Sequence, residues 1–352
     1  MRRRTFLAAM LASAAPRPVW ADVGSPAWLA AAALPDGSHR LHGLSAAGDI
    51  LFALPLPARG HAATAHPERP EAVAFARRPG TFALVIDCRA GREVARLTPP
   101  DGRQFNGHGA YSADGSVLYT SEVVAESSEG RLGLWDATRS YARIGEWSTG
   151  GIGPHDVKRL PLSDDLIVAN GGIQTDPTDR TKLNLDRMQP SLVRIAPDGR
   201  IIDHAGIADL PQNSIRHLAM LPDGRVAFAL QWEGDPAETV PLLGLWTPGS
   251  APILLPAPET EGYVMQGYAG SVAYSPALQA LAITSPRGGA LQVFGSDGRF
   301  IATHRRADVC GVAASPDGFL VTDGNGGLST LSDRLIPAQA APVAWDNHLI
   351  AL

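Results

Sequence analysis

Histidines recur along this chain at the spacing of a structural repeat. His61, His108 and His155 are separated by 47 residues each, and His217 and His348 fall in the same series. Neutral imidazoles that converge from different parts of a chain are typical ligands of borderline metals such as copper, zinc and iron(II). The sequence therefore indicates a site for one such ion, provided that the fold brings the five residues together.

The elements that must position these residues are short strands. The chain has 352 residues, of which 45% are apolar and only 18% charged, with 37 glycines and 29 prolines. This composition predicts a large core and many tight turns rather than disorder or long amphipathic helices. Six turn tetrads that end in Asp-Gly favour hairpins. They are residues 34–37, 112–115, 196–199, 221–224, 295–298 and 315–318.

The turns and their flanking strands define seven units. The units open at His61, His108, His155, His217, Ser271, Cys310 and His348, at intervals of 47, 47, 62, 54, 39 and 38 residues. An insertion at 174–189 accounts for the longest interval. Units of about 47 residues are close in length to a four-stranded propeller blade. We predict an all-β, seven-bladed β-propeller that spans 22–352 as one domain, with a pair of open β-sandwiches as the alternative.

The two ends of the chain are expected to share one blade. Residues 348–352 have the pattern of an inner strand, and residues 28–56 have the pattern of outer strands without an inner strand before them. Strands from the N- and C-termini would therefore close the ring in a single blade.

Inner strands line the channel of a propeller, so their first residues are expected to meet at one mouth. Glu122 follows His108 by fourteen residues and is expected to return to that mouth, where it completes the metal shell or orients an imidazole. The same register places five further residues there: Asn170, Gln231, Ser271, Arg287 and Cys310. His42 and His66 are instead expected at the surface, and no disulfide is predicted between Cys88 and Cys310.

Other interpretations of the histidines remain open. Gly60-His61, Gly107-His108 and Trp135-Asp136 match the structural hydrogen-bond network of WD-repeat propellers, although the other units do not sustain it. A small-molecule site without metal is a further alternative. Sequence motifs of serine hydrolases, P-loop proteins, c-type haem proteins and zincins are absent. The net charge of −5 argues against a nucleic-acid surface.

The first 21 residues have the features of a signal peptide. Arg2, Arg3 and Arg4 precede an apolar run at 6–15 that is too short to span a bilayer, and a small-x-small cleavage pattern ends at Ala21. Arg3-Arg4 followed by Thr5-Phe6-Leu7 fits the twin-arginine consensus, with an ordinary secretory signal as the alternative. We expect export to the periplasm of a Gram-negative bacterium, and no further stretch of the mature chain is apolar enough to span a membrane.

Several motifs occur in the order found in one bacterial family. They include Phe105-Asn106-Gly107-His108-Gly109, Gly153-Pro154-His155-Asp156, Ser214-Ile215-Arg216-His217 and Ser285-Pro286-Arg287-Gly288-Gly289. In these motifs the chain resembles the exported propellers of domain of unknown function 1513. The resemblance implies twin-arginine export and places Arg216 among the mouth residues. It also implies gene neighbourhoods, and so partners, among periplasmic iron-uptake proteins that are imelysin-like or di-haem peroxidase-like.

The residues and the resemblance together favour a periplasmic metal-binding protein, an accessory of iron or copper uptake that holds iron, copper or zinc at the channel mouth. Whether the protein is an enzyme stays open. A metal-dependent oxidoreductase or a lactonase-like hydrolase is one alternative, because propellers host both kinds of chemistry. A docking scaffold without metal, which uses the blade edges and the 174–189 insertion, is the other.

Overall fold

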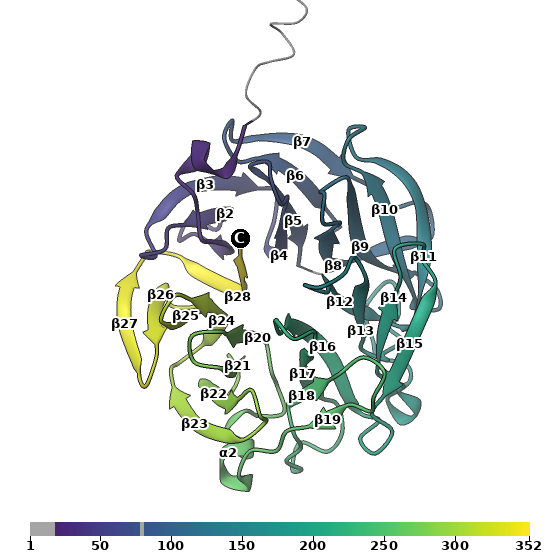
Figure 1. Ribbon diagram of the computed structural model, residues 1–352, viewed down its shortest axis with the longest axis vertical. Helices are drawn as coiled ribbons and strands as arrows, with labels where there is room; N and C mark the ends of the chain where they lie inside the picture. The colour runs from purple at the N-terminus through teal and green to yellow at the C-terminus, as the bar shows by residue number, and fades with distance from the viewer. Residues whose placement is uncertain (1–17, 78–80) are drawn as a thin grey trace, which may run out of the picture.

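The computed structural model describes residues 18–77 and 81–352, so most of the predicted signal peptide lies outside the described residues. Within them, seven four-stranded antiparallel sheets form the blades of a ring (Figure 1). The prediction of an all-β, seven-bladed propeller is confirmed. No helix in this part of the chain is both long and apolar enough to cross a membrane.

Each blade has an inner, a second, a third and an outer strand. The inner strands are β4 (Gly60–Ala65), β8 (Arg103–Tyr111), β12 (Pro154–Arg159), β16 (Asn213–Met220), β20 (Ser271–Ser275), β24 (Val309–Ser315) and β28 (Ala344–Ala351). The second strands are β5 (Glu71–Ala76), β9 (Val117–Val124), β13 (Leu166–Asn170), β17 (Val226–Trp232), β21 (Ala280–Ser285), β25 (Gly318–Asp323) and β1 (Trp28–Ala33).

The remaining strands complete the blades towards the rim. The third strands are β6 (Ala83–Asp87), β10 (Glu129–Asp136), β14 (Ser191–Ile195), β18 (Leu243–Trp246), β22 (Ala290–Gly295), β26 (Gly327–Leu331) and β2 (His39–Leu44). The outer strands are β7 (Arg92–Leu97), β11 (Ala142–Ile152), β15 (Ile201–Gly206), β19 (Ile253–Leu254), β23 (Phe300–Arg305), β27 (Leu335–Ala340) and β3 (Ile50–Leu56). Three short helices, η1 (Trp20–Val23), η2 (Leu185–Arg187) and α2 (Glu259–Val264), lie between or before strands.

The ring is closed by strands from both ends of the chain. The C-terminal β28 pairs antiparallel with β1, from Trp28 opposite Ala351 to Ala33 opposite Ala344. The order β28-β1-β2-β3 makes this blade complete, as expected from the sequence. In Figure 1 the yellow C-terminal strand lies beside the purple N-terminal strands.

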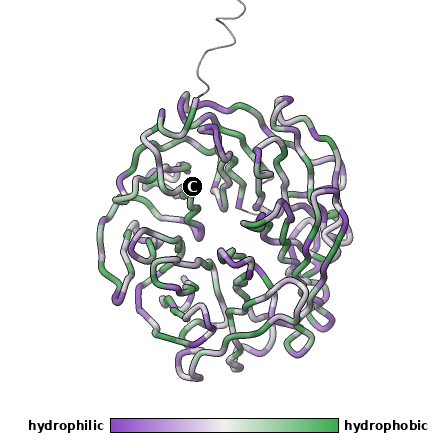
Figure 2. The backbone as a smooth tube through the Cα atoms, viewed as in Figure 1, coloured by the Kyte–Doolittle hydropathy of each residue, from purple (hydrophilic) through white to green (hydrophobic). Residues whose placement is uncertain are grey.

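The core is divided among the interfaces between neighbouring blades. In one cluster, Phe228 and Trp246 pack with Ile215 of their own blade and with Leu192 of the preceding blade. Burying a large apolar side chain contributes about 1.5–3 kcal/mol, so these interfaces hold the blades in fixed relative positions. Outer strands such as β27 are largely exposed, and in Figure 2 hydrophilic segments are frequent in the turns at the rim.

Five of the six predicted Asp-Gly turns share one geometry. The glycine has a φ between +69° at Gly115 and +90° at Gly298, and the aspartate accepts a hydrogen bond from the backbone two residues on, as Asp223 does from Arg225 at 3.1 Å. The sixth turn differs, because Ser315 pairs directly with Gly318. That pairing leaves a hairpin with only two residues in its turn.

The insertion at 174–189 lies between β13 and β14 and includes η2. It contacts the two blades on either side of its own. Ser128 donates a hydrogen bond to the carbonyl of Thr175 at 3.3 Å, and Gln212 donates one to the carbonyl of Leu185 at 3.1 Å. Lys182 forms an ion pair with Glu233. These contacts join the insertion to the blades on either side of its own.

Candidate metal centre

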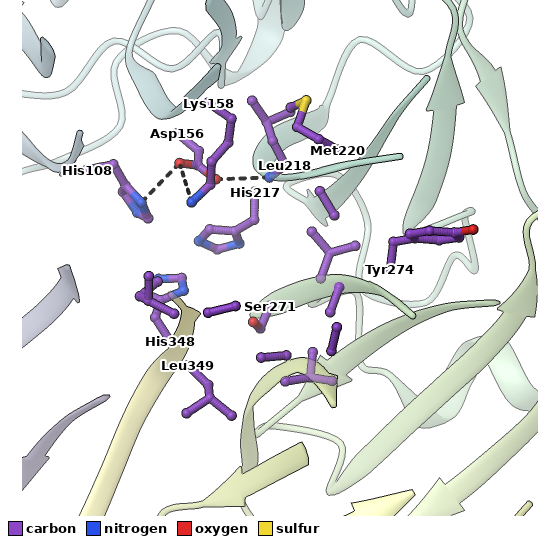
Figure 3. A pocket seen from close by; sticks show the side chains of 18 residues that line it. His108, Asp156, Lys158, His217, Leu218, Met220, Ser271, Tyr274, His348 and Leu349 are labelled. Atoms are coloured by element: carbon purple, nitrogen blue, oxygen red, sulfur yellow. Dashed lines mark hydrogen bonds and ion pairs between the residues drawn. The ribbon is translucent and has the colours of Figure 1, made fainter. Parts of the chain in front are cut away.

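The five histidines of the repeat meet inside the channel. They come from the inner strands of five blades, and Figure 3 shows three of them, His108, His217 and His348, grouped together. Their Nε2 atoms face one another. The Nε2 of His61 lies 3.2 Å from that of His108 and 3.3 Å from that of His348, and the Nε2 atoms of His155 and His217 are 3.0 Å apart. The structure therefore brings together all five histidines singled out in the sequence.

Each of these histidines lies at an irregularity in its strand. The pairing of inner and second strands shifts between Gly60 and Ala63, Phe105 and Gly109, Pro154 and Val157, and Ile215 and His217, and also where β28 pairs with β1. A β-bulge re-aims side chains and is common beside functional sites. By contrast, β20 pairs regularly from Ser271 onward. In β24 the pairing also shifts, between Val309 and Val312, around Cys310. Six of the seven inner strands are therefore irregular at this level, including all five that carry the imidazoles.

Gly107 leaves the space that His61 occupies. Its φ is +93°, and a Cβ at this position would lie 2.9 Å from Cδ2 of His61. Glycine is the residue that takes such a φ without strain. The Gly-His pair of this blade therefore serves the cluster through its glycine as well as its histidine.

Four of the imidazoles form a set that could hold a metal ion. The ligand nitrogens of His61, His108, His217 and His348 all lie within 4.8 Å of one another. In a tetrahedral site with typical zinc–imidazole bonds, ligand nitrogens are separated by about 3.3 Å. Both Nε2 contacts of His61 match that spacing. His155 lies beside the set, with its ring centroid 4.8 Å from that of His108.

Burial favours the neutral form of His61, His155, His217 and His348. It lowers the pKa of His61 to about 4, although the carboxylate of Asp346 acts in the opposite direction. Burial also holds the pKa values of His155, His217 and His348 well below the ordinary range, and the other imidazoles add to this effect. A neutral imidazole keeps the lone pair that a metal requires.

Asp156 contacts the far side of one imidazole. Its Oδ1 lies 3.3 Å from Nδ1 of His108, and the carboxylate accepts hydrogen bonds from the backbone of Val157 and Leu218 at 2.9 and 3.0 Å. A carboxylate on Nδ1 orients an imidazole whose Nε2 faces a metal. Because Asp156 belongs to β12 and His108 to β8, this contact crosses between blades.

Asp346 faces Nδ1 of His61 in a similar way, but from beyond hydrogen-bond distance. Its Oδ1 lies 3.6 Å from Nδ1 of His61, and ion pairs with Arg59 at 2.6 Å and Arg77 at 2.9 Å hold the carboxylate in place. Neither aspartate was predicted from the sequence to act at the cluster. The available signal was an aspartate close to a channel histidine, in His155-Asp156 and in Asp346 two residues before His348.

Replacing Asp156 with asparagine is expected to weaken metal binding about 10- to 100-fold, because outer carboxylates that orient ligating histidines typically contribute this much. Competition with a chromophoric chelator measures the change. Asp186→Asn, on the exposed surface of η2, is the matched control. Equal affinities for the two variants would contradict the assigned role.

The comparisons with known proteins agree with the fold and the repeat. The family model described as "Protein of unknown function (DUF1513)" matches residues 54–352. The chain belongs to this family. A comparison with curated proteins finds no match. Among solved structures, the chain is similar to one titled "Kuenenia stuttgartiensis Hydrazine Synthase", with a TM-score of 0.61 and 15% identity over 83% of this chain and 91% of that chain. At this identity the likeness shows the fold alone.

In this DUF1513 chain Glu122 does not join the histidines, which corrects the expectation that it completes the metal shell. Its carboxylate accepts hydrogen bonds from Arg143 at 2.8 and 2.9 Å and from the hydroxyl of Thr120 at 2.7 Å. The side chain lies against β10, where a Cβ on Gly133 would come within 1.9 Å of its Oε1. Glycine at that position leaves room for the buried ion pair.

Glu122→Gln is therefore expected to lower the free energy of unfolding by about 2 kcal/mol, because it removes one of the two carboxylates that bind Arg143 and leaves Glu146 at 3.1 Å. Metal content should not change. Urea denaturation and elemental analysis measure the two quantities. Glu129→Gln removes an exposed carboxylate whose partner Arg131 keeps Glu146 at 3.3 Å, and it should cost less than about 1 kcal/mol. Metal loss without loss of stability in Glu122→Gln would restore its predicted role as a ligand.

Three other predicted mouth residues have different surroundings. Ser271 lines a cavity together with His108, His217 and His348. The thiol of Cys310 contacts the carbonyl of Trp345 at 3.4 Å, and burial raises its pKa to about 12, which disfavours the thiolate that binds metals. The amide of Asn170 donates a hydrogen bond to the carbonyl of Thr149 at 3.0 Å. Of these three, only Ser271 shares a cavity with the histidines.

The remaining predicted residues gather around Tyr268. Gln231 forms a β-bridge with Tyr268, and the guanidinium of Arg287 lies over the Tyr268 ring at 4.5 Å. Arg216 lies 3.9 Å from Glu233, and burial lowers its pKa. Arg216 directly precedes His217, but none of these three residues belongs to the four-histidine set.

Two histidines expected at the surface are buried. His42 packs edge-to-face on Trp345, with ring centroids 5.2 Å apart. His66 accepts a hydrogen bond at Nδ1 from the backbone of Arg69 at 3.0 Å and packs on Tyr111. Both serve the packing of the blades.

Proposed function

We propose that this protein is a periplasmic metal-binding β-propeller that holds one transition-metal ion on the histidine cluster and serves a metal-uptake system. The observation that carries the proposal is the convergence of the Nε2 atoms of His61, His108, His217 and His348. At distances of 3.0–3.3 Å, facing Nε2 atoms of neutral imidazoles can hydrogen-bond to one another, and in the other tautomer they turn their lone pairs towards a common cation. The number of imidazoles that meet at this one point supports the cation.

The donor set favours a borderline metal. The cluster offers imidazole nitrogen without thiolate or carboxylate ligands among the described residues. Imidazole suits iron, copper and zinc, whereas calcium and magnesium prefer oxygen. The site therefore supports iron(II), copper or zinc, and the export signal and family resemblance favour iron or copper uptake.

The periplasmic location rests on the sequence of the leader. Arg3 and Arg4 precede the apolar run at 6–15, and Val19-Trp20-Ala21 gives a cleavage pattern. Twin-arginine export carries folded proteins, which would allow the metal to be loaded before export. Imelysin-like and di-haem peroxidase-like proteins are the proposed partners.

The test is elemental analysis of protein exported by its own leader and purified from the periplasm. About one equivalent of iron, copper or zinc is expected. His204→Ala, on the exposed face of β15, should retain the metal. Changing Arg3 and Arg4 together to lysine should hold the protein in the cytoplasm. Exported, folded protein that contains no metal and binds none on titration would overturn the proposed function.

The protein should retain its metal ion down to an unusually low pH. An ordinary imidazole takes up a proton near pH 6.5, but burial lowers the pKa of His61 to about 4. Protons therefore compete with the metal nearer pH 4 than pH 6.5. Equilibrium dialysis at pH 7, 6, 5 and 4 should show retention at pH 5 and release towards pH 4. Half-release at pH 6 would contradict this prediction.

The same lowered pKa values should make the metal-free protein less stable in acid. Unfolded histidines take up protons below about pH 6.5, whereas burial lowers the pKa of His61 to about 4 and also lowers the pKa values of His155, His217 and His348. The unfolded state therefore binds more protons in this window, and stability falls as the pH falls through it. Urea denaturation of metal-free protein at the same four pH values measures the effect.

A further inference from the structure

A cavity of about 230 Å³ opens beside the histidine cluster (Figure 3). One end is lined by His108, His217 and His348, and the wall continues along β20 and β24. These two inner strands carry Ser271 and Cys310 where the other five carry histidine. The cavity is therefore the side of the cluster that the imidazoles leave uncovered.

The charged groups around the cluster do not compensate a bound cation. Among the described carboxylates, Asp156 and Asp346 are the two within ion-pair distance of the five imidazoles. Asp346 is already paired with Arg59 and Arg77, and Asp156 lies 4.0 Å from the ammonium of Lys158. Three cations thus face two carboxylates. Because a buried charge is costly unless it is paired, an anion from outside the chain would stabilise a divalent metal ion here.

The cavity has a suitable size and lining for a small anion. Its volume corresponds to about eight water molecules and is below the range of sites for drug-sized ligands. Lys158 contributes a positive charge and Ser271 a hydroxyl, while Ala273, Val312 and Leu349 contribute apolar wall. Asp156 also lines the cavity, and its carboxylate is paired with Lys158 and His108. This combination favours a ligand with an anionic oxygen at one end and a short apolar chain at the other.

We propose that the cavity binds a small carboxylate, which completes the coordination of the metal ion. The inference rests on the proposed metal site. The carboxylate group faces the histidines and Lys158, and its chain lies along β20 and β24. Each ligand then increases the affinity for the other, because the metal ion and the carboxylate neutralise each other's charge.

Cobalt(II) titration of the full chain, followed by visible absorption, tests the two proposals in sequence. Binding of cobalt by itself reports the metal site. Sodium acetate or sodium butyrate is then added at constant ionic strength, with chloride as the comparison. A saturable change in the cobalt bands is expected with both carboxylates, together with cobalt binding at least about fivefold tighter.

Two variants test whether the anion binds in the cavity. Lys158→Met is expected to weaken the response to acetate about fivefold, whereas Lys182→Met, an exposed lysine of the insertion, should match the wild type. Ser271→Leu fills the cavity and should abolish the response of the cobalt bands to butyrate.

The outcomes separate the two proposals. If cobalt binds but neither its absorption bands nor its affinity changes with acetate or butyrate, the anion site is overturned and the metal site is retained. A response that is unchanged in Lys158→Met and Ser271→Leu would put the anion elsewhere and also overturn the inference. Absence of cobalt binding would overturn both.

Discussion

Changing His61 and His217 together to alanine is expected to reduce the metal content from about one equivalent to none. His61 contacts both His108 and His348 through Nε2, and His217 contacts His155. The double change therefore removes two ligands from the set of four and breaks every Nε2 contact under 3.5 Å between described histidines of the cluster. The two that remain in the set cannot complete a tetrahedral shell. Elemental analysis after exhaustive dialysis measures the result.

Two controls make this result specific. His204→Ala changes an exposed histidine of β15 and should leave the metal content unchanged. The free energy of unfolding of the metal-free double variant should change by no more than about 3 kcal/mol, since the changes remove neutral groups and leave no buried charge unpaired. His155→Ala should have a smaller effect than His217→Ala, because His155 lies outside the set of four. Full metal content in a folded double variant would rule out the cluster as the site.

Deleting residues 344–352 is expected to abolish cooperative folding. The deletion removes β28, which pairs with β1 and supplies Trp345 and Leu349 to a buried cluster with Trp28 and Leu44. Loss of a large core side chain typically costs about 3–5 kcal/mol, and a domain has a net stability of only about 5–15 kcal/mol. The exposed edge of β1 should also promote aggregation. Thermal unfolding and gel filtration measure these effects.

A circular permutant is the matched control for this deletion. Ala351 lies opposite Trp28, so residues 344–352 can be placed before β1 through a short turn, with the new C-terminus after β27. This chain keeps every strand and should fold. A truncated chain that unfolds at the same temperature as the full one would show that closure by β28 contributes little.

The ring and its histidines could be predicted because they depend on local patterns. Asp-Gly turns and alternating apolar residues specify hairpins from a few neighbouring residues, and repetition of the pattern places His61, His108 and His348 at one level. Closure of the ring by both ends of the chain could be predicted in the same way. Residues 28–56 have the pattern of outer strands without an inner strand, and residues 348–352 have the pattern of the missing inner strand. These features require no knowledge of how two blades face each other.

Other features depend on contacts that the spacing does not encode. Glu122 has the expected place on β9, but a glycine on the next strand and Arg143 beyond it draw its carboxylate away from the channel. Asp156 and Asp346 act on histidines of neighbouring blades, so their roles appear only when the blades are assembled.

The sequence by itself determined the number of blades, the closing strands and the level at which the histidines meet, because local hydrogen bonding and a strand period of two act within one blade. Tertiary structure alone decided the bulges that accompany the imidazoles in the channel, the carboxylates behind them and the cavity beside Ser271. Those depend on how far one blade is rotated and shifted against the next. That placement results from the packing of many side chains distant in the chain, and no single motif carries it.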